Sequence, residues 1–244
     1  MFDPFADFAI AGYLRNHFGE KDPEIVRTLE HQVFRAGVDD AFALLAARPH
    51  LHYEDFLEVH GALFSDLYPW AGQDRSTTAP GIVVSKERIL FCHPKDCRRA
   101  VEEGLRLAQR HGGMRAHCGE IMGLFAYGHP FLDGNGRTML VIHTELCDRA
   151  GFAIDWHRIG KYSYLQMLSA EIETPGNGLL DGFLAPFVVE RNERNERSAW
   201  GASLGLLKGL DGAGSVDRVE GSLDDPAVSR SYQAFDEKRA YRAR

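Results

Sequence analysis

The chain has 244 residues, of which 44% are hydrophobic, and it carries a formal net charge of −7 with a pI near 5.9. A chain of this length can bury one sizeable core, so we expect one domain followed by a tail. The acidic balance argues against nucleic acid as the main partner, because a phosphate backbone requires a basic surface, but it does not argue against a bound nucleotide. No stretch of about 20 apolar residues and no charged-then-apolar leader is visible, so we expect no membrane span and a cytoplasmic location.

The N-terminal part, residues 1–67, has a helical pattern throughout. Glu24 to Phe42 and His52 to Leu67 each carry apolar residues at a spacing of three to four, which is typical of helices that face a core. Tyr68 to Gly72 interrupts the pattern, and Ser76 to Gly81 is predicted to be a loop.

Residues Ile82 to Cys92 are the one place where the sequence predicts strands. Two apolar runs flank the polar residues 85–88, which is the pattern of a short hairpin. Lys95 to His111 is then predicted to be a helix. The four cysteines fit no zinc spacing and are expected to be buried thiols. They are Cys92, Cys97, Cys118 and Cys147.

The stretch from His129 to Thr138, HPFLDGNGRT, concentrates a base, a carboxylate, two glycines, an amide and an arginine in ten residues. Apolar residues at helical spacing precede and follow it, so the stretch is predicted to be a loop that opens a helix. The first N–H groups of a helix have no partner within the helix, and the helix dipole favours an anion there. Phosphate is the expected anion.

Four residues of this loop suit a phosphate. Gly134 and Gly136 let the backbone approach closely because they have no Cβ atom. Asn135 can fix either the loop or a phosphate oxygen through its side chain. Arg137, in the first helical turn, adds a forked charge that matches phosphate geometry.

The other two functional side chains of the loop predict metal and proton chemistry. Asp133 would repel a phosphate unless a cation lay between them, and Mg²⁺ held by one carboxylate and phosphate oxygens resolves that conflict. His129 stands at the other end of the loop and can take a proton from an incoming hydroxyl near neutral pH.

HPFLDGNGRT resembles the signature of the Fic family, HPFx(D/E)GNGRxxR, through its first arginine. Further residues agree: Tyr68 to Gly72 and Arg75 resemble the segment ahead of the family's target-docking hairpin, and Ala150 to Trp156 resembles the turn after its signature helix. The resemblance covers roughly residues 50–189. It implies an all-α fold, a Fic-type helical bundle with a short β-hairpin flap over the active-site loop.

The resemblance also implies an activity, the transfer of AMP or a related moiety from ATP to a Ser, Thr or Tyr hydroxyl of a target protein. By motif position, His129 would be the catalytic base and Asp133 the Mg²⁺ ligand. Gly134 to Gly136, with Asn135, would form the anion hole, and Arg137 would contact phosphate. The exposed edge of the flap would dock an extended target segment by strand addition. The flap residues concerned are Ile82, Val83 and Val84.

One position departs from the family pattern, because Leu140 stands where the signature has a second arginine. By resemblance, that arginine holds the γ-phosphate of ATP. Three interpretations follow: ATP binds more weakly, the donor is a diphosphate-containing molecule without a γ-phosphate, or the nucleotide lies reversed, as in Doc-type toxins that phosphorylate their target. Doc-type loops usually carry a lysine where this chain has Gly136, so AMP transfer is favoured over phosphoryl transfer. A non-catalytic Fic-fold scaffold is the remaining alternative.

These patterns divide the chain into two parts. Residues 1–189 form the expected catalytic domain, with the flap at about 80–93 and the signature loop at 129–138. Ile159 to Ile172 and Leu179 to Val189 are its last predicted helices. Residues 190–244 are predicted to be a charged helix and a weakly ordered tail, which serves as a partner-binding segment or as a signal for secretion into a host cell as an effector.

Many Fic proteins are inhibited by a helix with the motif (S/T)xxxE(G/N). The nearest match here, Ser215 to Glu220-Gly221, is one residue too long. We therefore expect either an inhibitor in trans, as an antitoxin, or a different form of regulation.

Overall fold

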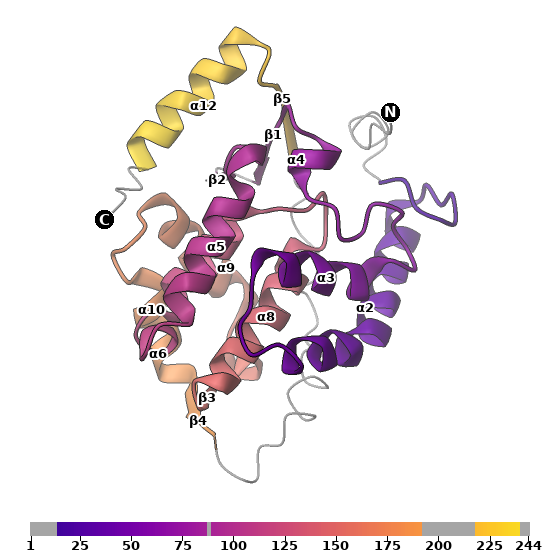
Figure 1. Ribbon diagram of the computed structural model, residues 1–244. Helices are drawn as coiled ribbons and strands as arrows, with labels where there is room; N and C mark the ends of the chain where they lie inside the picture. Colours follow the sequence, from indigo (N-terminus) through magenta and orange to yellow (C-terminus); the bar gives the residue numbers. More distant parts are fainter. Residues whose placement is uncertain (1–13, 87–88, 192–217, 240–244) are drawn as a thin grey trace.

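The computed structural model describes residues 14–86, 89–191 and 218–239, and most of its elements are helices (Figure 1), which confirms the predicted all-α class. The helices are α2 (Pro23–Ala46), α3 (Tyr53–Phe64), α4 (Arg75–Thr78), α5 (Cys97–Ala108), α6 (Gly113–Ala116), α7 (Cys118–Gly128), α8 (Asn135–Arg149), α9 (Lys161–Glu173), α10 (Leu179–Leu184) and α12 (Pro226–Arg239). The strands are β1 (Ile82–Lys86), β2 (Ile89–Leu90), β3 (Phe152–Ile154), β4 (Val188–Glu190) and β5 (Arg218–Ser222). Single 3₁₀ turns cover Pro94–Asp96, Trp156–Arg158 and Ala185–Phe187.

Helix α8 lies at the centre of the molecule and begins inside the HPFLDGNGRT stretch, as predicted. It packs against α2, α3, α7 and β3. Because most of its residues face neighbouring elements, most of α8 is buried, including polar residues such as Asn135, Arg137 and His143. The loop before α8 is therefore anchored to a helix that is packed on several sides.

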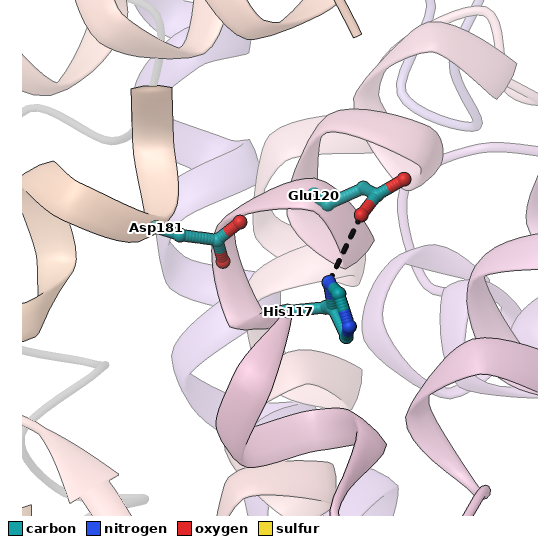
Figure 2. A group of neighbouring side chains, drawn as sticks. All are labelled: His117, Glu120 and Asp181. Carbon is teal, nitrogen blue, oxygen red and sulfur yellow. Dashed lines mark ion pairs between the residues drawn. The ribbon is translucent and has the colours of Figure 1, made fainter. Parts of the chain in front are cut away.

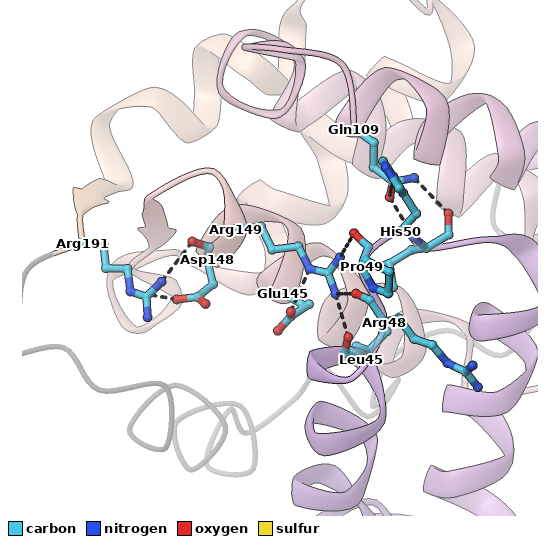
Figure 3. A network of polar contacts seen from close by, with 10 residues as sticks. Leu45, Arg48, Pro49, His50, Gln109, Glu145, Asp148, Arg149 and Arg191 are labelled. Carbon is cyan, nitrogen blue, oxygen red and sulfur yellow. Dashed lines mark hydrogen bonds and ion pairs between the residues drawn. The ribbon is translucent and has the colours of Figure 1, made fainter.

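The C-terminal end of α8 is fixed to the end of α2 by Arg149 (Figure 3). Its guanidinium donates hydrogen bonds to the carbonyl oxygens of Leu45 and Arg48, at 2.7 and 2.8 Å. The last carbonyls of a helix have no N–H donor four residues later, so the arginine adds a donor and acts as a C-terminal cap; the Leu45 carbonyl oxygen also accepts the Arg48 N–H at 3.0 Å. The Arg149 Nε atom also pairs with the buried Glu145 carboxylate at 2.9 Å.

The predicted hairpin is confirmed, with β1 antiparallel to β2. The prediction that its outer edge is exposed is wrong, because β5 pairs antiparallel with the other side of β1 and the strand order is β2-β1-β5. The expectation of strands only at 82–92 is also wrong, since β3 and β4 form a second antiparallel pair. The chain returns along β1 and β3 from distant parts of the sequence, which no local pattern indicates.

Several predicted boundaries need correction. Residues 14–22 form turns and extended chain, so the N-terminal part is not helical throughout. The predicted loop 76–81 contains most of α4, because the Asp74 side chain caps a single helical turn. The last predicted helix ends at Leu184, and strand β4 follows.

The C-terminal region departs further from its prediction. The charged helix predicted from Glu190 onward falls mostly on 192–217, outside the described residues. Residues 218–239, which the sequence predicted to be weakly ordered, form β5 and α12. Figure 1 shows α12 continuing from β5 along the periphery of the molecule.

Candidate active site

His129 ends helix α7 in the left-handed conformation, with φ 40° and ψ 56°, and among the described residues it is the one non-glycine residue with positive φ. This conformation is costly for a residue with a Cβ atom, so the surroundings must impose it. The imidazole lies flat on the ring of Phe91, with ring centroids 3.6 Å apart and an interplanar angle of 6°. Phe91 directly follows β2, so the flap sets the orientation of the predicted base.

Arg75 fixes the backbone on which His129 stands. Its Nε atom donates to the His129 carbonyl oxygen at 2.7 Å, and its backbone N–H donates to the Pro130 carbonyl oxygen at 2.7 Å. A third bond, from Nη2 to the Cys92 carbonyl oxygen at 3.1 Å, connects the same side chain to the end of the hairpin. Arg75 is fully buried, and it therefore holds the loop and the flap in a fixed relation.

The middle of the signature loop is closed by its own side chains. Asn135 exchanges two hydrogen bonds with the backbone of Phe131, donating at 2.7 Å and accepting at 2.8 Å. Of the two roles that the sequence allowed for Asn135, the structure therefore shows loop fixation. The Asp133 carboxylate accepts from the Gly134 N–H at 2.5 Å, and its side chain is 45% exposed.

Gly134 and the following residues form the N-terminus of α8. Gly134 has φ 75°, and a Cβ atom there would lie 2.6 Å from the Phe64 ring, so only glycine fits. The first intrahelical bond is donated by Thr138 to the Gly134 carbonyl oxygen at 2.9 Å. The N–H groups of residues 135–137 have no carbonyl four residues earlier within the helix, which is the arrangement that favours an anion.

His60, from α3, contacts the signature loop at Phe131 and Asp133, and the sequence interpretation missed it. Its Nδ1 atom accepts the Gly72 N–H at 2.9 Å, so Nε2 carries the proton and donates to the Asp133 carbonyl oxygen at 3.0 Å. Its ring stacks on Phe131 with a centroid distance of 3.8 Å. Burial lowers the pKa of His60 to about 3, so the ring is neutral at physiological pH.

Arg137, the predicted phosphate contact, is buried and only 5% exposed. Its Nη2 atom lies 3.1 Å from a carboxylate oxygen of Glu30 on α2, and its guanidinium stands over the Phe64 ring at 4.7 Å. The Asp133 carboxylate lies 3.5 Å away, and the buried Nη1 atom of Arg137 has no hydrogen-bond partner. Burial raises the pKa of Glu30 to about 7, and Asp133 adds to this effect while Arg137 opposes it.

Leu140 is 2% exposed and belongs to the hydrophobic core. The structure therefore places the position that departs from the family pattern among apolar side chains, and no charge replaces the absent arginine at that point of α8. The residues of the sequence-predicted site that the fold brings together are those of the loop itself and the flap. His60, Phe91 and Glu30 are found only in three dimensions, and for Arg75 the sequence indicated a resembling segment but not its contacts. Glu30 and His60 are polar residues within the apolar faces of α2 and α3, which was the available signal.

A second group of polar side chains lies away from this loop (Figure 2). His117 and Glu120 form an ion pair at 3.1 Å at the start of α7, and Asp181 of α10 lies beside them. The Asp181 carboxylate accepts the Gly119 N–H at 2.6 Å, which satisfies one of the first N–H groups of α7. This group is therefore explained by helix capping and packing.

Among the residues that the structure describes, no helix combines the length and apolar character needed to cross a membrane.

Comparison with known proteins identifies the chain's relatives. The model of the Fic/DOC family matches residues 50–147. The chain is 27% identical over 188 residues to the protein adenylyltransferase VbhT of Bartonella schoenbuchensis, covering 70% of this chain but 36% of VbhT, so it spans about a third of that relative. It is 30% identical over 152 residues to the probable protein adenylyltransferase y4lH of Sinorhizobium fredii, covering 57% of this chain and 71% of y4lH. The chain belongs to the Fic/DOC family.

Solved structures of Fic proteins support the fold. The BepC protein of Bartonella tribocorum, solved with bound AMPPNP, superposes with a TM-score of 0.60 at 17% identity, covering 75% of this chain and 95% of that chain. The N-terminal Fic domain of a Bartonella quintana effector, solved with bound ADP, gives 0.61 at 18% identity, with coverage of 76% and 94%. At these identities the likeness establishes the Fic fold, a helical bundle with a small antiparallel hairpin.

Proposed function

We propose that this protein is a nucleotide-dependent transferase that moves AMP from ATP to a Ser, Thr or Tyr hydroxyl of a target protein. The observation that carries this proposal is the loop from His129 to Arg137, which combines a buried imidazole, a half-exposed carboxylate and the N-terminus of α8 in one short stretch. Two relatives are named protein adenylyltransferases, and two Fic structures contain a nucleotide, which supports the same assignment.

In the proposed reaction, His129 accepts the proton of the target hydroxyl. The hydroxyl oxygen then forms a bond to the α-phosphorus, the bond between that phosphorus and the bridging oxygen breaks, and pyrophosphate leaves. The unpaired N–H groups of residues 135–137 are placed to stabilise negative charge on the α-phosphate oxygens. Arg75 and Phe91 keep His129 in one orientation, so little reorganisation precedes proton transfer.

The donor set of the loop fits a magnesium ion. Asp133 offers a carboxylate that is 45% exposed, and Mg²⁺ is commonly held by one or two carboxylates together with substrate phosphates. Bound there, the ion would neutralise charge on the phosphates. The same carboxylate lies 3.5 Å from Arg137 Nη2, directly before the N-terminus of α8.

Phosphoryl transfer from a reversed nucleotide is the second candidate, and the apolar surroundings of Leu140 favour it. In the AMP-transferring orientation the γ-phosphate finds Leu140 instead of an arginine on α8 and lacks that charged hydrogen bond. A nucleotide bound in the opposite direction does not depend on this contact. A donor without a γ-phosphate also does not need the missing arginine contact.

The deciding experiment uses ATP labelled separately at the α- and γ-phosphate, with Mg²⁺ and host lysate. Wild-type protein should transfer the α-label, and His129→Ala should abolish transfer while retaining nucleotide binding. His117→Ala, which changes a half-exposed histidine outside the loop, is the matched control and should keep full activity. Transfer of the γ-label alone would replace AMP transfer by phosphorylation, and full activity of His129→Ala would refute the role of the base.

A further inference from the structure

The hairpin edge that would receive an extended target segment is already paired with the chain's own C-terminal region. Strand β5 runs antiparallel to β1 with Ile82 opposite Ser222 and Val84 opposite Val219. The ladder is extended by a bond from the Leu223 N–H to the Gly81 carbonyl oxygen at 2.8 Å. An antiparallel strand pair satisfies backbone donors and acceptors on both members, so β1 presents no open row of these groups here.

The paired edge is directly connected to the proposed base. Val219 of β5 lies opposite Val84, and the Val84 carbonyl oxygen accepts the Phe91 N–H at 3.1 Å. Phe91 in turn stacks on the His129 ring. A target strand in the place of β5 would therefore pair with the strand that supports Phe91 and, through it, His129.

Strand β5 contains a β-bulge where it pairs with β1. Val83 pairs with Gly221 and Val84 with Val219, so Glu220 is the extra residue between them. The Glu220 carboxylate accepts a hydrogen bond from the buried Ser85 hydroxyl of β1. The Glu220 side chain offers no Ser, Thr or Tyr hydroxyl, so it is not an acceptor for the proposed transfer.

The helix that follows holds β5 in place. Gly221, at φ 137°, packs so closely on Val228 of α12 that a Cβ atom would lie 3.0 Å from it. Further along α12, the ring of Tyr232 meets His93, just after the hairpin, edge to face at 6.0 Å. Strand and helix therefore dock on the hairpin as one unit, 218–239.

On the basis of the proposed function, we propose that unit 218–239 is an intramolecular competitor that occupies the target-docking edge of β1, so that a target binds only when β5 has left. The occupant is a segment of this chain itself. Because it is tethered, its local concentration at β1 is on the order of millimolar and independent of protein concentration. If β5 holds the edge for about 90–99% of the time, the apparent affinity for a target segment is lowered by about 10- to 100-fold.

A release variant of the full chain, Val219→Pro with Gly221→Val, tests the proposal. Proline fixes φ at about −65°, which is disfavoured inside a strand, and valine is strained at the Gly221 conformation and collides with Val228. We expect the amide protons of Val83 and Ser85, which alternate with the β2-facing Val84, to exchange faster with solvent than in the wild type. A fluorescent peptide with the sequence of residues 216–224 should bind the release variant and not the wild type. Target modification at low target concentration should rise by about tenfold or more. Gln233→Ala, on the exposed side of α12, is the control and should behave as wild type.

A locking variant provides the opposite perturbation without loss of structure. Ile82→Cys with Ser222→Cys places two thiols on paired residues, and the oxidised form should neither bind the peptide nor modify target, while reduction restores the wild-type behaviour. Equal peptide binding and equal exchange in wild-type, release and locked proteins would overturn the inference. Peptide binding that follows the inference, with no label transferred by any variant, would instead refute the proposed transferase function and leave the occupied edge established.

Discussion

Replacement of His60 by phenylalanine tests whether the signature loop is held by the tautomer assigned above. Phenylalanine keeps the stack on Phe131 but removes both hydrogen bonds, from the Gly72 N–H at 2.9 Å and to the Asp133 carbonyl oxygen at 3.0 Å. Each buried group that loses its partner costs about 1–3 kcal/mol, and both groups here are only half-buried, so we take about 1 kcal/mol for each. The free energy of unfolding should therefore fall by about 2 kcal/mol.

For a chain of this size, about 2 kcal/mol corresponds to a decrease in Tm of about 4–8 °C. Thermal unfolding followed by circular dichroism at pH 7.5 measures this decrease, and label transfer should fall as well because Asp133 is no longer fixed. His60→Gln, which restores a donor for the Asp133 carbonyl oxygen, should recover part of the lost stability. Unchanged Tm and unchanged transfer in His60→Phe would show that these two bonds do not hold the loop.

Two further predictions concern charge and backbone conformation in the same site. The pKa of Glu30 is raised to about 7 from an ordinary 4.5, so the folded state binds more protons than the unfolded state between these values. The free energy of unfolding should therefore fall by on the order of 3 kcal/mol as the pH rises through this window. Chemical denaturation at a series of pH values should show that Glu30→Gln removes this pH dependence and that the exposed Glu24→Gln does not. Gly134→Ala adds a strained left-handed residue and a collision with the Phe64 ring, whereas Gly151→Ala, at φ 82° with no atom within 4 Å, adds only the strain. Gly134→Ala should therefore lower stability by about 1–3 kcal/mol more than Gly151→Ala and abolish transfer, and equal losses would contradict the close packing of the loop.

Local chemistry carried most of the predictions about the loop. A glycine-rich turn that opens an apolar helix specifies where α8 begins, because glycine conformations and helix periodicity are properties of neighbouring residues. The same holds for the hairpin at 82–92. The supporting contacts were beyond such reasoning: His60 reaches Asp133 across 73 positions of the chain, and Glu30 reaches Arg137 across 107.

The sequence by itself determined the helical class, the position of the signature loop and the residue types available for base, metal and phosphate chemistry. Only the tertiary structure decided that Arg75 grips the His129 backbone, that Leu140 faces the core, and that β5 closes the edge of β1. Strand pairing uses backbone groups that every residue possesses, so the sequence of residues 218–222 does not name its partner. Which edge is filled depends on where the chain returns in space.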